Sequence, residues 1–309
     1  MFFSWTEMKR FFTPRRSFFD KYCLSSNELG RGAFGSVYLG QRRSDHKLFA
    51  IKIIPIEHKQ DCVREIDILT KLPKSPNICG FIDSYEDDKN IYIVLEHIQG
   101  QDLYKYLKPH LGNDLTKIPF LLEILQQCVQ AIAEIHAAGI FHRDLKLENF
   151  MITFDKSGKP LIKLIDFGLS DIIGKIRQTR FGSSFWMAPE VMWGGKRNLI
   201  SQKADIWSLG MIMVELFYGN PMFSEMSSFD QMLAVARLIS PPIPLKMIDD
   251  NSAFGIWFRS LATMCLQIDP ESRPTAEELA VFSQTCSIPL LHNWELTLTK
   301  SHFIIICHK

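Results

Sequence analysis

The feature that most constrains the fold of this chain is a series of five short motifs in one fixed order. A glycine-rich segment at residues 30–37 (GRGAFGSV) is followed by an Ala-Ile-Lys triplet at residues 50–52. Three further clusters lie at residues 142–149 (HRDLKLEN), 166–168 (DFG) and 188–190 (APE). A glycine triplet alone is weak evidence, because it is more often an ordinary hairpin turn. Five motifs in this order are specific evidence for one kind of protein.

The length and composition of the chain are those of an ordinary globular protein. Its 309 residues are enough for one large domain or for two lobes that share a cleft. The hydrophobic share of 46% and the charged share of 22% are typical of soluble domains. A net charge of +1 gives no field strong enough to attract nucleic acid, so we expect no nucleic-acid partner.

The scattered cysteines, and a start of the chain that does not resemble a signal peptide, favour a reducing compartment. The seven cysteines are scattered without paired metal-ligand spacing, which favours reduced thiols over disulfides or a zinc site. The longest apolar run, at residues 303–307 (FIIIC), is far too short to span a membrane. Glu7, Lys9 and Arg10 interrupt the aromatic start of the chain, so no signal-peptide core is expected there. The expected location is the cytosol or the nucleus.

The pattern of secondary structure changes near residue 100. Residues 22–95 are rich in strand patterns and glycine turns, with one helical stretch at 62–72. Residues 90–95 predict a buried strand that leads into a hinge. Beyond the hinge, apolar periodicity predicts helices at 120–138 (ended by Gly139), 205–218 and 254–266, and another that Thr275 caps. The sequence therefore predicts an α+β fold with a small β-rich lobe, a larger helical lobe and a ligand cleft at their joint.

Taken together, the motifs resemble the signature of eukaryotic-type protein kinases over roughly residues 24–286. The resemblance implies the two-lobed protein kinase fold, with a helix C in the small lobe. It also implies transfer of the γ-phosphate of ATP, with Mg²⁺, to serine or threonine hydroxyls of protein substrates. The implied division is an N-terminal extension (1–22), a kinase domain (23–286, with N-lobe 23–95, hinge 96–100 and C-lobe 101–286) and a C-terminal tail (287–309).

Lys52 is the first residue to which both the local sequence and the resemblance give a role. It lies in an apolar strand, where an unpaired lysine would be costly, so it should face an acidic partner. The resemblance makes Glu65 of helix C that partner. The ion pair would hold Lys52 against the α- and β-phosphates of ATP.

The catalytic and metal-binding roles follow from the polar clusters. Phosphoryl transfer needs an oriented hydroxyl and neutralised charge. The resemblance makes Asp144 the catalytic base and Lys146 the residue that neutralises charge on the γ-phosphate. Asn149 and Asp166 supply the oxygen ligands that suit Mg²⁺.

The expected nucleotide site is larger. Glycines in the first loop allow the backbone to approach the phosphates closely. Val37 and Ala50 would cover the adenine, and Leu95 would be the gatekeeper at the end of the strand before the hinge. The full set that the resemblance assigns to ATP is Gly30, Arg31, Gly32, Ala33, Phe34, Gly35, Val37, Ala50, Lys52, Leu95, Glu96, Ile98, Asp102 and Met151.

Other matches are expected to be structural. Glu190 should pair with Arg273, and Asp205 should hydrogen-bond the backbone of the catalytic loop. A hydrophobic stack that couples the lobes is expected from His142, Phe167, Leu69 and Phe81.

The substrate class follows from the catalytic loop and the segment before the Ala-Pro-Glu motif. Lys146 and Ser183 resemble serine/threonine kinases, although Ser183-Ser184 replaces a more usual Thr-Pro. Residues 182–190 resemble kinases upstream of mitogen-activated cascades and residues 166–170 resemble calmodulin-dependent-like kinases, so the subfamily stays open. A pseudokinase scaffold is the main alternative, and a kinase acting on lipid or small metabolites is a third. The intact catalytic set argues against the pseudokinase. The segment that ends at Ala-Pro-Glu argues against a kinase acting on lipid or small metabolites.

Three acidic residues raise the question of substrate sequence. Asp102, Glu148 and Glu215 occupy positions that face arginines of the substrate in basophilic kinases. The competing interpretation gives them structural roles, as a helix N-cap, a surface charge and a structural partner.

Regulation also has two interpretations. Thr179 matches the activating phosphothreonine of many relatives, and Arg143 would bind its phosphate. Alternatively, Asp171 or Asp61 pairs directly with Arg143, and the segment is active without phosphate. The basic and aromatic extension at residues 1–22 either docks on a partner or membrane surface, or packs on the small lobe.

Overall fold

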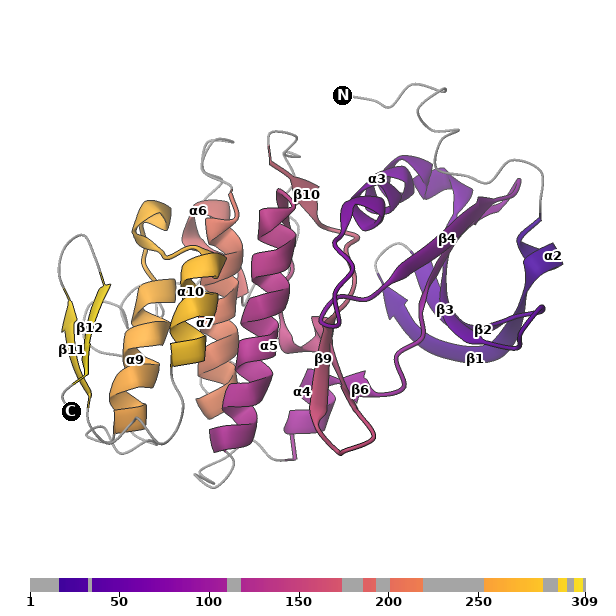
Figure 1. Cartoon of the computed structure of the whole chain (residues 1–309). Helices are drawn as coiled ribbons and strands as arrows, with labels where there is room; N and C mark the ends of the chain where they lie inside the picture. Colours follow the sequence, from indigo (N-terminus) through magenta and orange to yellow (C-terminus); the bar gives the residue numbers. More distant parts are fainter. Residues whose placement is uncertain are drawn as a thin grey trace.

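The computed structural model describes residues 17–32, 35–109, 118–173, 186–192, 201–218, 253–285, 294–298 and 303–307. Figure 1 shows a small lobe built around a curved sheet beside a larger lobe of packed helices. This is the predicted α+β architecture of two lobes.

The small lobe is a five-stranded antiparallel sheet with the order β1-β2-β3-β5-β4. One long helix, α3, packs against it through buried residues that include Val63 and Ile66. The 3-10 turn η1 leads into this helix. The elements are β1 (Tyr22–Gly32), β2 (Gly35–Arg42), β3 (Leu48–Pro55), η1 (Ile56–His58), α3 (Lys59–Lys71), β4 (Phe81–Glu86) and β5 (Asn90–Glu96).

A short helix, α2 (Phe18–Lys21), fixes the end of the N-terminal extension to this sheet. The ring of Phe18 stacks on Tyr92 with centroids 4.4 Å apart and also on Tyr22 at 5.5 Å. Lys21 forms an ion pair with Asp83 of β4 at 2.8 Å. Residues 17–22 therefore pack on the small lobe, which is one of the two interpretations of the extension. Residues 1–16 lie outside the described part of the chain.

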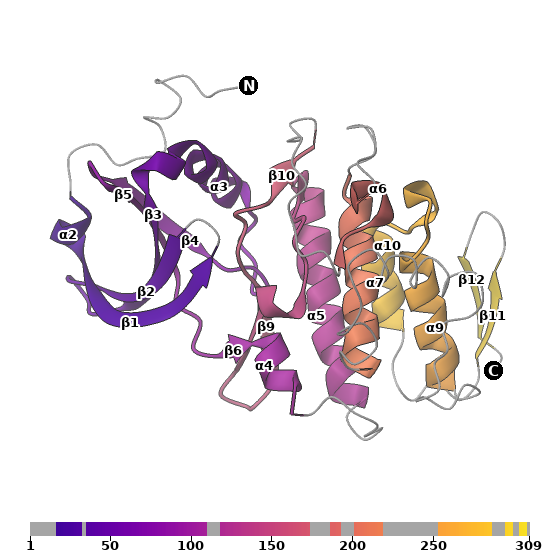
Figure 2. The same ribbon diagram turned by 180° about the vertical axis from the view of Figure 1, so that it is seen from behind.

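The large lobe is organised around α5, which packs against α7 and α10. Figure 2 shows α5, α7 and α9 side by side, with α7 in the middle. The described side chains of α7 are buried on almost every side, which matches its nearly continuous apolar sequence. The helical elements are α4 (Leu103–Leu107), α5 (Ile118–Ala137), α6 (Pro189–Met192), α7 (Lys203–Tyr218), α9 (Ala253–Cys265), η7 (Pro270–Ser272) and α10 (Ala276–Thr285).

Two small sheets lie between the lobes. The segments that connect their strands contain two of the polar clusters, at residues 142–149 and 166–168. One has the order β6-β8-β9, and the other pairs β7 with β10. The 3-10 turn η3 connects the catalytic loop to β8. The elements are β6 (Gln101–Asp102), β7 (Ile140–Phe141), η3 (Leu147–Asn149), β8 (Phe150–Phe154), β9 (Pro160–Leu164) and β10 (Asp171–Ile172).

The predicted helices are present, with ends that differ by at most three residues. Gly139 adopts φ 74° directly after α5, a left-handed conformation that ends the helix at low cost. Thr275 accepts a hydrogen bond from the backbone N–H of Glu278, and the Glu278 carboxylate accepts one from Thr275. This capping box confirms the predicted start of α10.

The C-terminal tail contains a hairpin that the sequence analysis did not predict. Strand β11 (Trp294–Leu298) pairs antiparallel with β12 (Phe303–Cys307). Figure 1 places the hairpin beside α9, at the far end of the large lobe from the small lobe. Among the described residues, no helix is both long enough and apolar enough to cross a membrane.

Candidate active site

Lys52 meets two carboxylates at the joint between the lobes. Its Nζ lies 2.7 Å from Oε1 of Glu65 on α3 and 3.1 Å from Oδ1 of Asp166. The lysine is only 5% exposed, and Glu65 is 4% exposed. The predicted Lys52–Glu65 contact is therefore present, and it also reaches the Asp-Phe-Gly segment.

The charges in this cluster shift one another's pKa. The ammonium of Lys52 is the main cause that lowers the pKa of Asp166 to about 2. Burial disfavours the charged form of Lys52, but the carboxylates of Glu65 and Asp166 outweigh it and raise the pKa of Lys52. The Lys52 ammonium therefore lies between the carboxyl groups of Glu65 and Asp166.

Asp144 is held by its neighbours in the catalytic loop. Lys146 Nζ lies 3.0 Å from Oδ2 of Asp144. The amide of Asn149 donates to the backbone carbonyl of Asp144 at 2.7 Å and to Oδ2 at 3.1 Å. A carboxylate fixed in this way is oriented before a substrate arrives.

Asp205 of α7 fixes the backbone that leads to Asp144. Its carboxylate accepts hydrogen bonds from the backbone N–H groups of His142 at 2.7 Å and Arg143 at 2.9 Å. Arg143 adopts φ 71°, which is unfavourable for a non-glycine residue and must be held by its surroundings. Burial disfavours ionisation of Asp205, yet the hydrogen bond with His136 and the one from the backbone N–H of Arg143 lower its pKa. The predicted contact between Asp205 and the catalytic loop is confirmed.

The glycine-rich loop forms the hairpin between β1 and β2. Gly30 pairs with Val37, and Gly32 pairs with Gly35, across the turn. A Cβ on Gly35 would lie 2.1 Å from the carbonyl oxygen of Ile53, so the packing of β2 on β3 demands glycine. The space around Gly30 is open. Ala33 and Phe34 lie outside the described residues, and Arg31 is exposed and paired with Glu28 at 3.0 Å.

The residues expected to contact adenine lie on one face of the small-lobe sheet. Ala50 pairs with Leu95, and Lys52 pairs with Val37, in the registers of β3 with its two neighbours. Side chains directly opposite each other in an antiparallel pair point to the same face. Ala50 and Lys52 are two residues apart on one strand, so all four side chains share a face.

The expected hinge begins at Glu96, which is anchored from two sides. Its Oε2 accepts hydrogen bonds from Nζ of Lys163 at 3.0 Å and from the backbone N–H of Gly80 at 3.1 Å. Ile98 is buried, and its carbonyl accepts a hydrogen bond from the backbone N–H of Gly100 at 3.0 Å. The backbone of the expected adenine-binding segment is thus held firmly.

Asp102 and Met151 lie opposite each other where β6 pairs with β8. The Asp102 carboxylate accepts from the backbone N–H of Lys105 and caps α4, and it also pairs with Nζ of Lys105 at 2.8 Å. Asp102 therefore has the structural N-cap role that was one interpretation of this residue.

The expected hydrophobic stack is assembled across the lobes. The rings of His142 and Phe167 meet edge to face with centroids 5.2 Å apart. Leu69 and Phe167 belong to one buried cluster, and Phe81 packs against it. This continuous core joins α3 to the catalytic loop.

Arg143 pairs directly with Asp171, at 2.6 Å from Nη1 to Oδ2. The same carboxylate forms an ion pair with Arg64 of α3. Of the two interpretations for Arg143, the structure shows the one in which an aspartate pairs with it directly, and Asp171 provides this contact. Thr179 lies outside the described residues.

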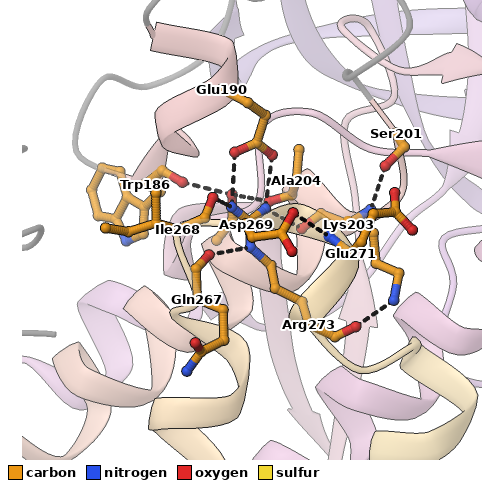
Figure 3. Close-up of polar contacts among 11 residues, drawn as sticks. Trp186, Glu190, Ser201, Lys203, Ala204, Gln267, Ile268, Asp269, Glu271 and Arg273 are labelled. Carbon is orange, nitrogen blue, oxygen red and sulfur yellow. Dashed lines mark hydrogen bonds and ion pairs between the residues drawn. The ribbon is translucent and has the colours of Figure 1, made fainter.

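Glu190 and Arg273 form a bidentate ion pair, shown in Figure 3. The two guanidinium nitrogens donate to the two carboxylate oxygens at 2.7 and 2.8 Å. Arg273 also donates to the backbone carbonyls of Gln267 at 2.7 Å and Lys203 at 2.8 Å. Because the guanidinium is buried and its donors are used, the pair ties the Ala-Pro-Glu motif firmly to the helical lobe.

Glu148 and Glu215 form an acidic pair near Trp186. Burial, and then the charge of Glu148, raise the pKa of Glu215 to about 7. The indole of Trp186 donates to Oε2 of Glu215 at 3.2 Å. Within the described residues, Oε1 of Glu215 and Oε2 of Glu148 are buried atoms without a hydrogen-bond partner. Two such carboxylate oxygens favour a cation.

Asn149 and Asp166 fit a hard divalent cation as part of a larger ligand set. The backbone N–H of Ile165 donates to the carbonyl of Asn149 at 2.9 Å, which places Asn149 beside the residue that precedes Asp166. In the described part of the chain, no group of three or more His, Cys, Asp or Glu side chains could hold a metal. The two oxygen-bearing side chains suit Mg²⁺, which draws its remaining ligands from phosphate and water.

Sequence reasoning missed Arg64 and Lys163. Lys163 is a charged residue in an apolar strand, residues 161–165 (LIKLI), and that pattern demands an acidic partner just as it does for Lys52. Arg64 offers no comparable signal, because an arginine on a helix is ordinarily solvated.

Comparison with known proteins decides the family. A family model described as "Protein kinase domain" matches residues 24–282. The chain belongs to the protein kinase family. The small lobe, hinge and helical lobe described above are the parts of this kinase fold, and the matched residues contain every site residue discussed.

Several curated kinases are similar to this protein kinase chain. Calcium-dependent protein kinase 33 of Arabidopsis thaliana is 35% identical over 268 residues, 82% of this chain and 48% of the plant protein. Serine/threonine-protein kinase chk-2 of Caenorhabditis elegans is 31% identical over 278 residues, 84% and 55% of the two chains. Serine/threonine-protein kinase KIC1 of Saccharomyces cerevisiae is 30% identical over 258 residues, 81% and 22%. The chain thus spans from about a fifth to just over half of these relatives.

Proposed function

We propose that this kinase transfers the γ-phosphate of ATP to serine or threonine hydroxyls of proteins. The observation that carries the proposal is the contact of Lys52 with both Glu65 and Asp166, beside an Asp144 held by Lys146 and Asn149. This arrangement joins α3, the Asp-Phe-Gly segment and the catalytic loop in one charged cluster. The names of the similar proteins supply the substrate class.

Each residue would have a distinct task. Lys52 would hold the α- and β-phosphates, and Asn149 and Asp166 would hold Mg²⁺, which neutralises phosphate charge when bound. Asp144 would orient the substrate hydroxyl and accept its proton. Lys146, already beside Asp144, would stabilise charge that develops on the transferred group.

The pseudokinase alternative predicts loss of at least one of these groups. All of these groups are present, and Lys52 forms its ion pair with Glu65. We place the activity in the cytosol or nucleus, where free thiols such as Cys79 and Cys128 stay reduced.

The test compares wild type, Asp144→Asn and Asp166→Asn with radiolabelled ATP and myelin basic protein. Asp144→Asn should lower kcat by about 100-fold or more while nucleotide affinity stays close to wild type, because the base acts only on the hydroxyl. Asp166→Asn should weaken Mg²⁺-supported nucleotide binding as well. An Asp144→Asn variant with the wild-type rate would exclude this assignment of the base.

We further propose that Glu148 and Glu215 bind an arginine of the protein substrate. Their two buried carboxylate oxygens without partners in the described chain are the support. A guanidinium carries several donors and matches two carboxylates well. In a positional-scanning peptide library, arginine before the acceptor should be preferred by wild type and not by Glu148→Gln. A wild-type enzyme without that preference would leave the pair with a structural role alone.

A further inference from the structure

A single buried carboxylate joins the two lobes beside the active site. Asp171 is fully buried, and it pairs with Arg143 of the catalytic loop at 2.6 Å and with Arg64 of α3. The first arginine belongs to the large lobe and the second to the small lobe. Asp171 is thus an ionic bridge between the lobes.

Asp171 is held in place by its own backbone. It pairs with Phe141 where β10 meets β7, and the backbone N–H of Ile173 donates to the carbonyl of Gly139 at 3.0 Å. The hydroxyl of the preceding Ser170 donates to the carbonyl of His142 at 3.2 Å. The carboxylate is therefore presented by a fixed strand.

The two arginines stand next to catalytic residues in the sequence. Arg64 directly precedes Glu65, the partner of Lys52, and Arg143 directly precedes Asp144. The ion pair with Arg64 restrains α3 from rotating away from the sheet. It therefore also keeps Glu65 in contact with Lys52. Holding Arg143 supports its left-handed backbone conformation, and with it the orientation of Asp144.

The bridge compensates the charge of a buried arginine. Arg143 is nearly buried, with a side chain that is 4% exposed, and needs a compensating anion. The carboxylate of Asp171 supplies that anion. A phosphate arriving at Arg143 would have to displace a buried, already satisfied partner.

We propose that Asp171 is a positioning residue that holds the active arrangement of both lobes without phosphorylation. Through Arg64 it sets Glu65, and through Arg143 it sets Asp144. The inference rests on the proposed kinase function, but the structural link it describes can be measured separately from activity.

The experiment compares the full wild-type chain with variants of the bridge and with one variant of the candidate phosphorylation site. The bridge variants are Asp171→Asn, Asp171→Glu, Arg64→Met and the double variant Arg64→Met/Asp171→Asn. The variant of the candidate phosphorylation site is Thr179→Ala. Each protein is treated with a phosphatase before assay, and loss of phosphate is checked by mass spectrometry. Lys71→Met is the matched control, because Lys71 is a cation on the same helix that pairs with Asp67 instead. The readouts are kcat, KM for ATP, and hydrogen exchange of the α3 amides.

We expect wild type and Thr179→Ala to keep their kcat after phosphatase treatment. Asp171→Asn and Arg64→Met should each lower kcat by about tenfold, and the double variant should be no slower than the worse single variant, because both remove one bridge. Asp171→Glu should restore part of the rate. The α3 amides should exchange faster in Asp171→Asn and at the wild-type rate in Lys71→Met.

Three results would overturn the proposal: a phosphatase-treated wild type that has lost its activity, an Asp171→Asn variant as fast as wild type, or additive effects in the double variant. A wild type with no transferase activity at all would refute the proposed function instead. In that event unchanged α3 exchange in Asp171→Asn would refute the bridge, and faster exchange would support it. Arg64→Met serves the same comparison if Asp171→Asn does not fold.

Discussion

Lys52 and Asp166 are 114 residues apart in sequence, yet the lysine ammonium lies 3.1 Å from the aspartate carboxylate. One residue comes from the sheet of the small lobe and the other follows β9 of the large lobe. The contact therefore brings the Asp-Phe-Gly segment against the sheet of the small lobe. Glu65 of α3 binds the same ammonium, so the same cluster also fixes the position of α3.

Lys52→Met should remove the cation around which this cluster is built. We expect kcat/KM for ATP to fall by about 100-fold or more, since a preorganised charge aimed at the phosphates is lost. The variant also leaves Glu65 and Asp166 without their shared counter-ion, so the pKa of Asp166 should rise. Steady-state kinetics over a range of ATP concentrations measure the first effect. Lys47→Met, which changes an exposed lysine just before β3, should keep wild-type kinetics.

Leu95→Gly tests where the nucleotide pocket ends. Leu95 pairs with Ala50 on β3 and with Phe81 on β4, so its side chain shares their face of the sheet. Removing it should open space at the back of the expected adenine pocket. ATP-site inhibitors with bulky aromatic substituents should then bind at least about tenfold more tightly, by the burial of new apolar area. Equal inhibitor affinities for wild type and variant would mean that the pocket lies elsewhere.

Some features were predicted correctly because the family resemblance assigns them, such as the Glu190–Arg273 pair and the contacts of Asp205. Others were predicted because the local sequence permits few solutions. A lysine inside an apolar strand requires a partner, and Lys52 has Glu65. A proline followed by Thr275 and Glu278 marks a helix start, and the capping box is present. In such places local chemistry permits few solutions, so the sequence predicts the structure well.

Other features depend on contacts that the sequence does not reveal. Gly35 is required by the carbonyl of Ile53 in a neighbouring strand, whereas the sequence suggested a need for close approach of phosphate. The partners of Asp171 depend on how β10 pairs with β7 and on the rotation of α3. The β11–β12 hairpin involves an apolar run that composition alone could describe only as too short for a membrane span. Each of these depends on tertiary geometry.

Arg273→Ala should destabilise the large lobe strongly. The substitution leaves the buried carboxylate of Glu190 without its partner and removes donors to the carbonyls of Gln267 and Lys203. Breaking a buried ion pair from one side costs about 3–5 kcal/mol of unfolding free energy. Arg273→Lys should recover only part of this, because an ammonium cannot make the bidentate contact. Urea unfolding followed by circular dichroism measures both, with exposed Glu277→Gln as the control.

Glu215→Gln should change how stability depends on pH. Burial and the charge of Glu148 raise the pKa of Glu215 in the folded protein to about 7, from an ordinary 4.5. Between these two values the folded chain binds a proton that the unfolded chain has released, so wild-type stability falls as pH rises through this window. The glutamine is neutral throughout and keeps an acceptor for the Trp186 indole.

The variant should therefore unfold at nearly the wild-type temperature at pH 5 and a few degrees higher at pH 8. Thermal unfolding at both values, with Glu277→Gln alongside, measures this difference. The same substitution should weaken the choice of arginine-containing peptides at pH 8, because a full negative charge is lost there. A melting-temperature difference that is equal at pH 5 and pH 8 would show that Glu215 does not titrate in this range.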